Sequence, residues 1–173
     1  MKKLVAVLVV LFMLFGFAQA EETAEYSWSN YEEAFEKSGV EAEFVTFEDV
    51  GVKILIPKAL PKWELSAEEI DHGFIFYYAD EKEETYVGMT YVPFETLEDY
   101  HNEIKGVEPI SDIRQVTING IPAVTYQVKS NDSMSIAFVN DAGKLLEVTV
   151  RPLSQEGAEE VWDMVISSIQ LVK

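Results

Sequence analysis

From Arg114 to Val150 the chain reads RQVTINGIPAVTYQVKSNDSMSIAFVNDAGKLLEVTV, and this stretch decides the fold. Asn119-Gly120 separates two apolar, β-branched runs. A type I′ turn requires positive φ at both central residues, which Asn and Gly tolerate best. We therefore predict a hairpin that pairs Ile118 with Ile121. Because proline has no N–H, the outer side of the second strand should be unpaired at Pro122.

Two more strands follow the hairpin. Residues 134–140 and 145–150 alternate between apolar and other side chains, and the polar stretches 129–133 and 141–144 between them are typical of turns. The second strand places Glu147 and Thr149 on the face opposite its apolar residues. Antiparallel strands with one polar face predict a sheet that is covered on one side and wetter on the other.

The remaining strands are predicted upstream. Residues 43–47 and 52–56 flank a short polar turn and form a second hairpin. Residues 74–79 are apolar on both faces, which predicts a central strand, and 85–92 should return beside it. Gly88 lies on the second face of that strand, where a neighbour can pack closely.

Three helices complete the pattern. The first is predicted over 30–37, with a capping box at Ser29-x-x-Glu32 and a stop at Gly39. The second spans about 97–105 and is capped by Thr96. The third follows Ser154 as its cap. The predicted class is α+β, with an antiparallel sheet of about six to eight strands flanked by three helices.

The first twenty residues have the three-part pattern of an export signal. Lys2-Lys3 is a positive start, 4–17 is an apolar run, and Ala18-Gln19-Ala20 is an A-x-A cleavage site. The alternative is an uncleaved anchor, but the apolar run is shorter than the ~20 residues of a membrane span. We predict cleavage after Ala20 and a secreted or periplasmic protein. No cysteine follows, so we expect no lipid anchor.

The net charge and the absence of cysteine exclude several classes of function. Removing 1–20 leaves 153 of 173 residues, and losing Lys2 and Lys3 moves the formal net charge from −18 to −20. A field this negative disfavours nucleic acid and anionic lipid, and favours basic partners, cations or simple solubility. The sequence contains no Cys, which excludes a thiol nucleophile, a thiolate metal site and a thiol redox role.

The order of elements resembles the PsbP-like family, named for the photosystem II oxygen-evolving accessory protein. The resemblance rests on 52–57 with Trp63, on the 116–123 hairpin leading to Tyr126, and on the closing helix with 166–169. It covers about 43–173, which we assign as a PsbP-like domain that follows the signal peptide at 1–20 and an acidic segment with one helix at 21–42. It also implies a non-enzymatic accessory or binding protein, and it carries no catalytic residue or cofactor.

No catalytic motif is present in the sequence. It has no G-x-S-x-G, no glycine-rich phosphate loop and no EF-hand pattern. Asp71 and His72 are the weak metal candidates, with an Asp turn motif as the favoured alternative. His101 falls on the apolar face of a helix, where we expect a packed or hydrogen-bonded histidine rather than a ligand.

Three functions remain open. The first is a non-enzymatic accessory protein that binds another envelope or extracellular protein through the wetter face of the sheet or a loop rim. The second is a binder of a small ligand or a divalent cation through the acidic loops. The third is a secreted hydrolase. A protein binder should expose an apolar patch, a ligand binder a concave pocket with convergent polar groups.

Overall fold

The computed structural model describes residues 24–172, which fold as two sheets and four α-helices. Sheet A has the strand order β1-β6-β7-β8-β9-β5-β4, and sheet B the order β10-β3-β2. The strands of sheet A are β1 (Ala24–Tyr26), β4 (Phe74–Ala79), β5 (Tyr86–Tyr91), β6 (Ile110–Ile118), β7 (Ile121–Val128), β8 (Ser133–Val139) and β9 (Leu145–Arg151). Sheet B has β2 (Ala42–Phe47), β3 (Val52–Pro57) and β10 (Gln170–Leu171). The helices are α2 (Trp28–Ser38), α3 (Ala67–Asp71), α4 (Leu97–Ile104) and α5 (Ala158–Ser167), with short 3₁₀ turns η1 (Glu48–Val50) and η2 (Lys129–Asn131).

The predicted central meander is confirmed. Ile118 pairs with Ile121, and Asn119 and Gly120 have φ of 48° and 80°. The β7–β8 ladder begins only at Ala123, so Pro122 has no ladder partner on that side, as its missing N–H requires. β8 and β9 continue the antiparallel order. The predicted α+β class is therefore correct, with the 43–47 and 52–56 hairpin in a second, smaller sheet.

The prediction of a central position for 74–79 is wrong. β4 is the edge strand of sheet A. Its outer edge is covered by the preceding loop, where Trp63 N–H donates to the Tyr77 carbonyl at 2.9 Å and Ala79 N–H donates to the Pro61 carbonyl at 3.2 Å. A strand that is apolar on both faces can thus lie at an edge when a loop covers its backbone groups.

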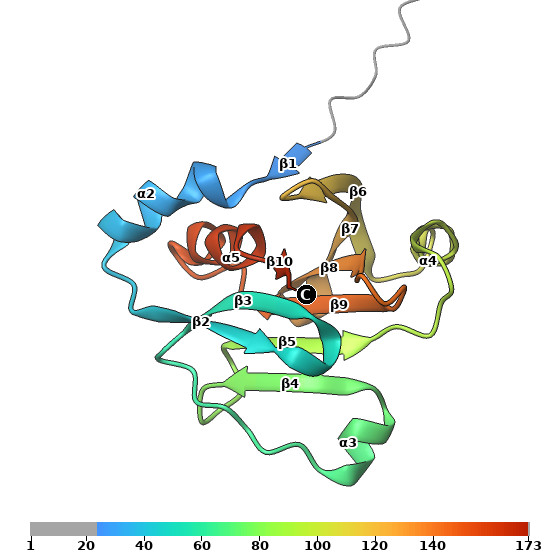
Figure 1. Cartoon of the computed structure of the whole chain (residues 1–173), viewed down its shortest axis with the longest axis horizontal. Helices are drawn as coiled ribbons and strands as arrows, with labels where there is room; N and C mark the ends of the chain where they lie inside the picture. The colour runs from blue at the N-terminus through green and yellow to red at the C-terminus, as the bar shows by residue number, and fades with distance from the viewer. Residues whose placement is uncertain (1–23, 173) are drawn as a thin grey trace, which may run out of the picture.

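The main core lies between the two sheets. The inner face of sheet A packs against sheet B and α5, while α4 packs on the outer face against β7 and β8. Figure 1 shows α2 and α5 at one side of the molecule and α4 at the opposite side, with the strands between them. The side chains that fill the main core include Ile54, Phe76, Ile136, Phe138, Leu146 and Ile166.

Two predicted helix caps are wrong. α2 begins at Trp28, so Ser29 lies inside the helix, and Gly39 ends it in the left-handed conformation as predicted. α5 begins after Gly157, because Ser154 is engaged elsewhere: its N–H and hydroxyl both donate to the Asp132 carboxylate. The predicted α4 and its Thr96 cap are confirmed.

The short α3 was missed. No helix or strand is predicted at the polar residues 64–73, but Ser66 and Glu69 form a capping box there. A reciprocal pair of this kind satisfies two free backbone donors, which favours a helical turn even in a polar stretch. The strands β1 and β10, each of three residues or fewer, were also missed, because such short segments carry no measurable periodicity.

The side chain of Asn119 connects three distant segments. Its amide oxygen accepts the Trp28 N–H at 2.9 Å, and its amide nitrogen donates to the carbonyls of Ser167 and Ile169 at 2.7 and 2.8 Å. Helix ends leave N–H and C=O groups without intrahelical partners. Asn119 therefore caps the start of α2 and the end of α5, which explains why α2 has no side-chain cap of its own.

Among residues 24–172, no helix is both long and apolar enough to cross a bilayer. The predicted signal peptide at 1–20 lies outside the described residues, and the predicted division at 42–43 stays a prediction.

Asn119→Ala should lower the free energy of unfolding by about 2–3 kcal/mol, because it removes three hydrogen bonds and puts alanine at positive φ. Asn119→Gly is the matched control: it also removes the hydrogen bonds but tolerates the turn, so its loss should be smaller by about 1 kcal/mol. Urea unfolding of both variants checks this. Equal stability of Asn119→Ala and the parent would show that the side chain is not a structural link.

Candidate functional site

The outer face of sheet A is only partly covered, as the predicted wetter face requires. α4 packs on β7 and β8 through Tyr100 and Ile104, which bury the outer side chains of those strands. The outer face over β4, β5 and β9 lies beyond the helix. A hollow of about 390 Å³ opens there. We call it the outer groove; it is lined by Glu69, Phe74, Tyr77, Glu83, Tyr86, Gly88, Thr90, Glu147 and Thr149.

Aromatic rings form one side of the outer groove. The rings of Tyr77 and Tyr86 lie 5.2 Å apart between centroids, and Phe74 meets Tyr77 edge-on at 6.4 Å. Gly88 makes this possible, because a Cβ at that position would come within 3.2 Å of the Tyr77 ring. The predicted close approach at Gly88 is thus confirmed, and the neighbour that approaches is a tyrosine lying on the sheet.

Glu147 closes the other side and is held by hydroxyl groups. Tyr126 donates to its Oε2 at 2.8 Å, and the Tyr100 hydroxyl lies within hydrogen-bonding reach of both Glu147 and Tyr126. Ser135 and Thr149 each donate to the other oxygen at 3.3 Å. The half-buried carboxylate is thereby fixed in position at the boundary between the part of the sheet covered by α4 and the outer groove.

The pKa values of the tyrosines around Glu147 and Glu83 reflect this environment. Burial, followed by the charge of Glu147, raises the pKa values of Tyr100 and Tyr126 far above the ordinary tyrosine value. Burial and Glu83 raise the pKa of Tyr77 in the same way, and the Tyr77 hydroxyl donates to Glu83 at 3.3 Å. These hydroxyls therefore remain protonated donors at neutral pH.

The folded protein should resist tyrosine ionisation. Its pKa values for Tyr77, Tyr100 and Tyr126 lie above the unfolded value of about 10, so their contribution to stability is full below about pH 10 and is lost as pH rises toward the folded values. Ultraviolet absorbance of tyrosinate against pH, with urea unfolding at each pH, measures both effects.

The variant Glu147→Gln distinguishes the tyrosines that depend on Glu147 from Tyr77, which does not. Removing that charge should lower the pKa values of Tyr100 and Tyr126 and leave Tyr77 unchanged, because Tyr77 depends on burial and Glu83. Simultaneous ionisation of every tyrosine near pH 10 in the folded parent protein would contradict the arrangement.

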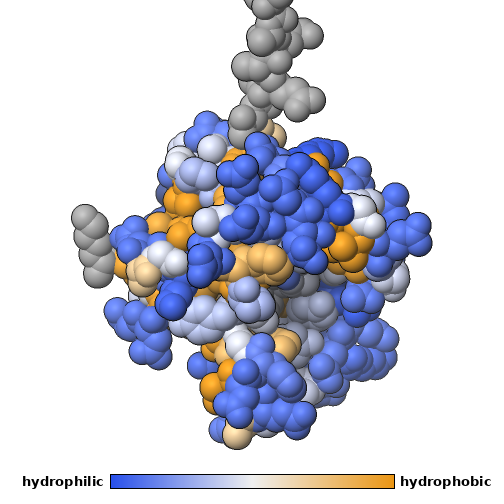
Figure 2. Space-filling view, turned by 90° about the vertical axis from the view of Figure 1, so that its right-hand side faces the viewer, coloured by the Kyte–Doolittle hydropathy of each residue, from blue (hydrophilic) through white to orange (hydrophobic). Residues whose placement is uncertain are grey.

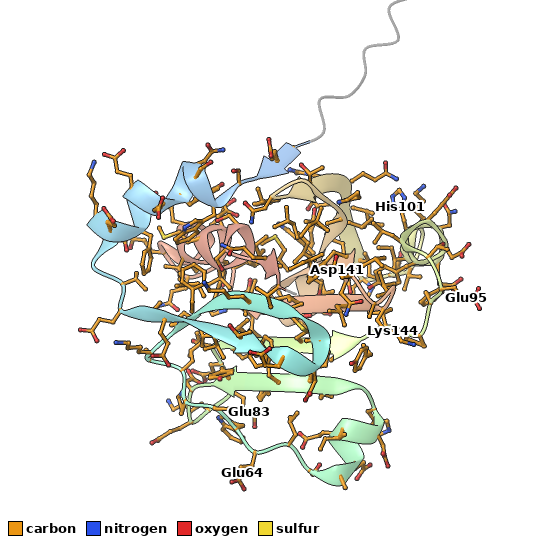
Figure 3. The ribbon with its side chains drawn as sticks, in the orientation of Figure 1. Glu64, Glu83, Glu95, His101, Asp141 and Lys144 are labelled. Carbon is orange, nitrogen blue, oxygen red and sulfur yellow. The ribbon has the colours of Figure 1, made fainter. Side chains whose placement is uncertain are left out.

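The weak metal candidates do not line the outer groove. Asp71 ends α3 and His72 is its exposed C-cap. Among residues 24–172, no group of three or more His, Cys, Asp or Glu is arranged to hold a metal ion. Figure 3 places Glu64, Glu83 and Asp141 on separate loops of the molecule.

His101 behaves as a structural histidine. Its Nδ1 lies 3.1 Å from the Gln115 side-chain nitrogen on β6, across the boundary between α4 and sheet A. Burial lowers its pKa below the usual value, and Lys105 adds to the effect. Figure 3 shows it on α4. The predicted hydrogen-bonded role is confirmed.

Sequence reasoning located only part of the outer groove. Alternation along β9 put Glu147 and Thr149 on the polar face, and Gly88 was recognised as a site of close packing. The contribution of Tyr77 was missed, because the apolar pattern of β4 suggested burial on both faces. No sequence signal joins Tyr100 to Glu147, since that contact depends on how α4 docks.

Comparison with known proteins identifies the fold. No protein-family model matches the chain, and no curated protein matches its sequence. Among solved structures, the chain is similar to cyanobacterial PsbP (CyanoP) from Synechocystis sp. PCC 6803, with a TM-score of 0.53 and 13% sequence identity over 76% of this chain and 93% of that chain. The chain therefore has a PsbP-like fold, as predicted.

Proposed function

We propose that the protein is an exported, non-enzymatic accessory protein that binds an envelope or extracellular partner by taking a Lys or Arg side chain into the outer groove. One observation carries the proposal: the rings of Tyr77 and Tyr86 lie in one hollow with the carboxylates of Glu69, Glu83 and Glu147.

The chemistry of the outer groove suits a cation. The face of a tyrosine ring attracts an ammonium or guanidinium group by about 0.5–2 kcal/mol, and nearby carboxylates add to the attraction. Arg151 illustrates the preference, because its guanidinium carbon lies 5.8 Å from the centroid of the Tyr86 ring. That contact leaves Tyr77 and Phe74 for a partner's side chain.

The carboxylates of the outer groove form no ion pair with a basic side chain of residues 24–172. Within residues 24–172, the one ion pair closer than 4.0 Å joins Lys37 to Glu33 on α2. Glu69, Glu83 and Glu147 can therefore attract a cation from outside the molecule. The negative net charge of the chain adds long-range attraction for a basic partner.

The surface favours a charge-guided, transient contact. The large exposed apolar residues Phe44, Ile70, Tyr91 and Val107 belong to four separate parts of the chain. On the face shown in Figure 2, apolar colour forms separate areas between hydrophilic ones. Obligate interfaces bury large, mostly apolar surfaces. The proposal therefore departs from the expectation that a protein binder exposes an apolar patch, because a basic side chain anchored in a groove does not need one.

Two features support the exported, accessory role. The chain shares its fold with cyanobacterial PsbP, and the resemblance of its sequence to the PsbP-like family implies an accessory role. The sequence carries no motif of nucleophilic or phosphoryl-transfer chemistry. The leader pattern of 1–20 supports export. Protein collected after secretion should begin at Glu21, which intact mass measures. Retention of residues 1–20 in the secreted protein would contradict the processing step.

A short Lys-rich peptide should bind residues 21–173 in the outer groove and shift the NMR signals of Tyr77, Tyr86 and Gly88. Glu83→Gln should weaken binding about threefold to tenfold, the effect of about 1 kcal/mol of lost attraction. Glu95→Gln is the matched control, because it removes the same charge from a loop residue that does not line the outer groove.

The same peptide with acetylated lysines tests the charge. It should lose binding, since acetylation removes the cation. Equal weakening by Glu83→Gln and Glu95→Gln, or equal binding of the acetylated peptide, would show a non-specific response to net charge and overturn the proposal.

A further inference from the structure

A second hollow lies on the opposite face of sheet A. It measures about 640 Å³ and is bounded by β1, α2, α5 and the ends of β6, β7 and β8. We call it the inner cavity, and its charged and aromatic side chains include Tyr26, Tyr31, Arg114, Lys129, Glu159 and Asp163. Pockets that hold small ligands have volumes of about 300–1,000 Å³, so its size suits one.

The inner cavity exists because the inner face of sheet A changes from apolar to polar along β6 and β7. Near the Asn119 turn this face is apolar and belongs to the main core, with Val116 and Ala123 buried. Farther from the turn the same face presents Arg114, Thr125 and Gln127. Polar side chains there leave α5 separated from the strands by a hollow instead of a packed interface.

Charges of both signs face one another across the inner cavity. Glu159 and Asp163 are four residues apart on α5, so they share one face of the helix. Arg114 and Lys129 line the exposed mouth. Within the described residues these four groups form no ion pair with one another at 4.0 Å or less. Their attraction is therefore available to a ligand.

Asp163 is the deepest of these charges. Burial and the charge of Glu159 raise the pKa of its carboxyl to about 6, and the Tyr31 hydroxyl partly offsets this. Tyr26 lies close enough for its own pKa to be raised by Asp163 and lowered by Arg114. The groups near Asp163 are thus Tyr26 of β1, Tyr31 of α2 and Glu159 of α5, while Arg114 of β6 acts on Tyr26.

From this arrangement we infer that the inner cavity binds a small ligand with a cationic group and a carboxylate, of the class of a basic amino acid. The cation would lie against Asp163 and Glu159, with the rings of Tyr26 and Tyr31 beside it. The carboxylate would face Arg114 and Lys129 at the mouth. Acids outnumber bases in the lining, which favours a ligand with an additional positive charge.

This inference is independent of the outer groove. The two sites lie on opposite faces of sheet A and have no lining residue in common. It gives the small-ligand alternative from the sequence a specific place in the fold, on charged groups other than the weak candidates Asp71 and His72.

The test is calorimetric titration of residues 21–173 with L-lysine, with cadaverine, which has the same amines but no carboxylate, and with L-glutamate. Lysine should bind at least tenfold more tightly than either. Cadaverine binding as tightly as lysine would overturn the requirement for a carboxylate, and glutamate binding as tightly would overturn the preference for a cation.

Two variants locate the site. Asp163→Asn should lower the lysine affinity at least tenfold and should not harm folding, because it removes a carboxylate whose burial is unfavourable. Arg114→Gln should weaken the binding of lysine, because Arg114 faces its carboxylate. Cadaverine has no carboxylate, so its affinity should change less than about twofold, or a few tenths of a kcal/mol. Glu36→Gln, an exposed position on α2, is the control for net charge.

Proton linkage provides an independent readout. Because the charged form of Asp163 binds the cation, lysine affinity should fall about tenfold between pH 7 and pH 5. Asp163→Asn should abolish most of this dependence. Unchanged lysine affinity in Asp163→Asn, or an identical pH profile in parent and variant, would overturn the inference.

Discussion

Three hydrogen bonds from the Asn119 amide join parts of the chain that are far apart in sequence: the turn of the central hairpin, the start of α2 and the end of α5. The turn needs a residue that tolerates positive φ, and the two helix ends need a donor and an acceptor. An asparagine meets all three needs at once. A second asparagine acts similarly two turns later in the meander, where Asn140 donates to the Val50 carbonyl at 2.9 Å. It connects the β8–β9 turn to η1, the turn between β2 and β3 of sheet B. Sheet B and α5, which cover the inner face of sheet A, are thus both connected to the turns of that sheet by side-chain amides.

This constraint shapes both candidate sites. With the layers fixed at the turn end of the meander, the apolar core fills that end, and the polar side chains of β6 and β7 line the inner cavity farther along the strands. On the outer face, α4 is attached through the contact of Tyr100 with Glu147 and does not extend over β4 and β5, where the outer groove opens. Each hollow is therefore a consequence of where a covering element stops. The PsbP-like fold in this chain offers two separate polar hollows, one on each face of the same sheet.

Local chemistry made much of the fold predictable. Asn119-Gly120 predicted the turn and its register, the Thr96 cap predicted α4, and alternation along β8 and β9 predicted which side chains face the core. Two of the errors share a cause, which is that a distant segment supplied what local reasoning assigned nearby. Asn119 caps α2 where Ser29 was expected to, and the 61–63 loop covers the edge of β4. The same limit applies to the sites, since the acids and tyrosines of each hollow come from four or more elements whose docking no sequence pattern encodes.

The proposed function depends most on the outer groove being the place where a partner binds. Site-specific photo-cross-linking in the secreting cells measures this directly, with the photoreactive residue placed at Thr90 inside the outer groove or at Glu36 on α2. The account predicts a discrete cross-linked protein from Thr90, absent from Glu36 and reduced by Glu83→Gln. The same adducts from both positions, or none from Thr90, would contradict it.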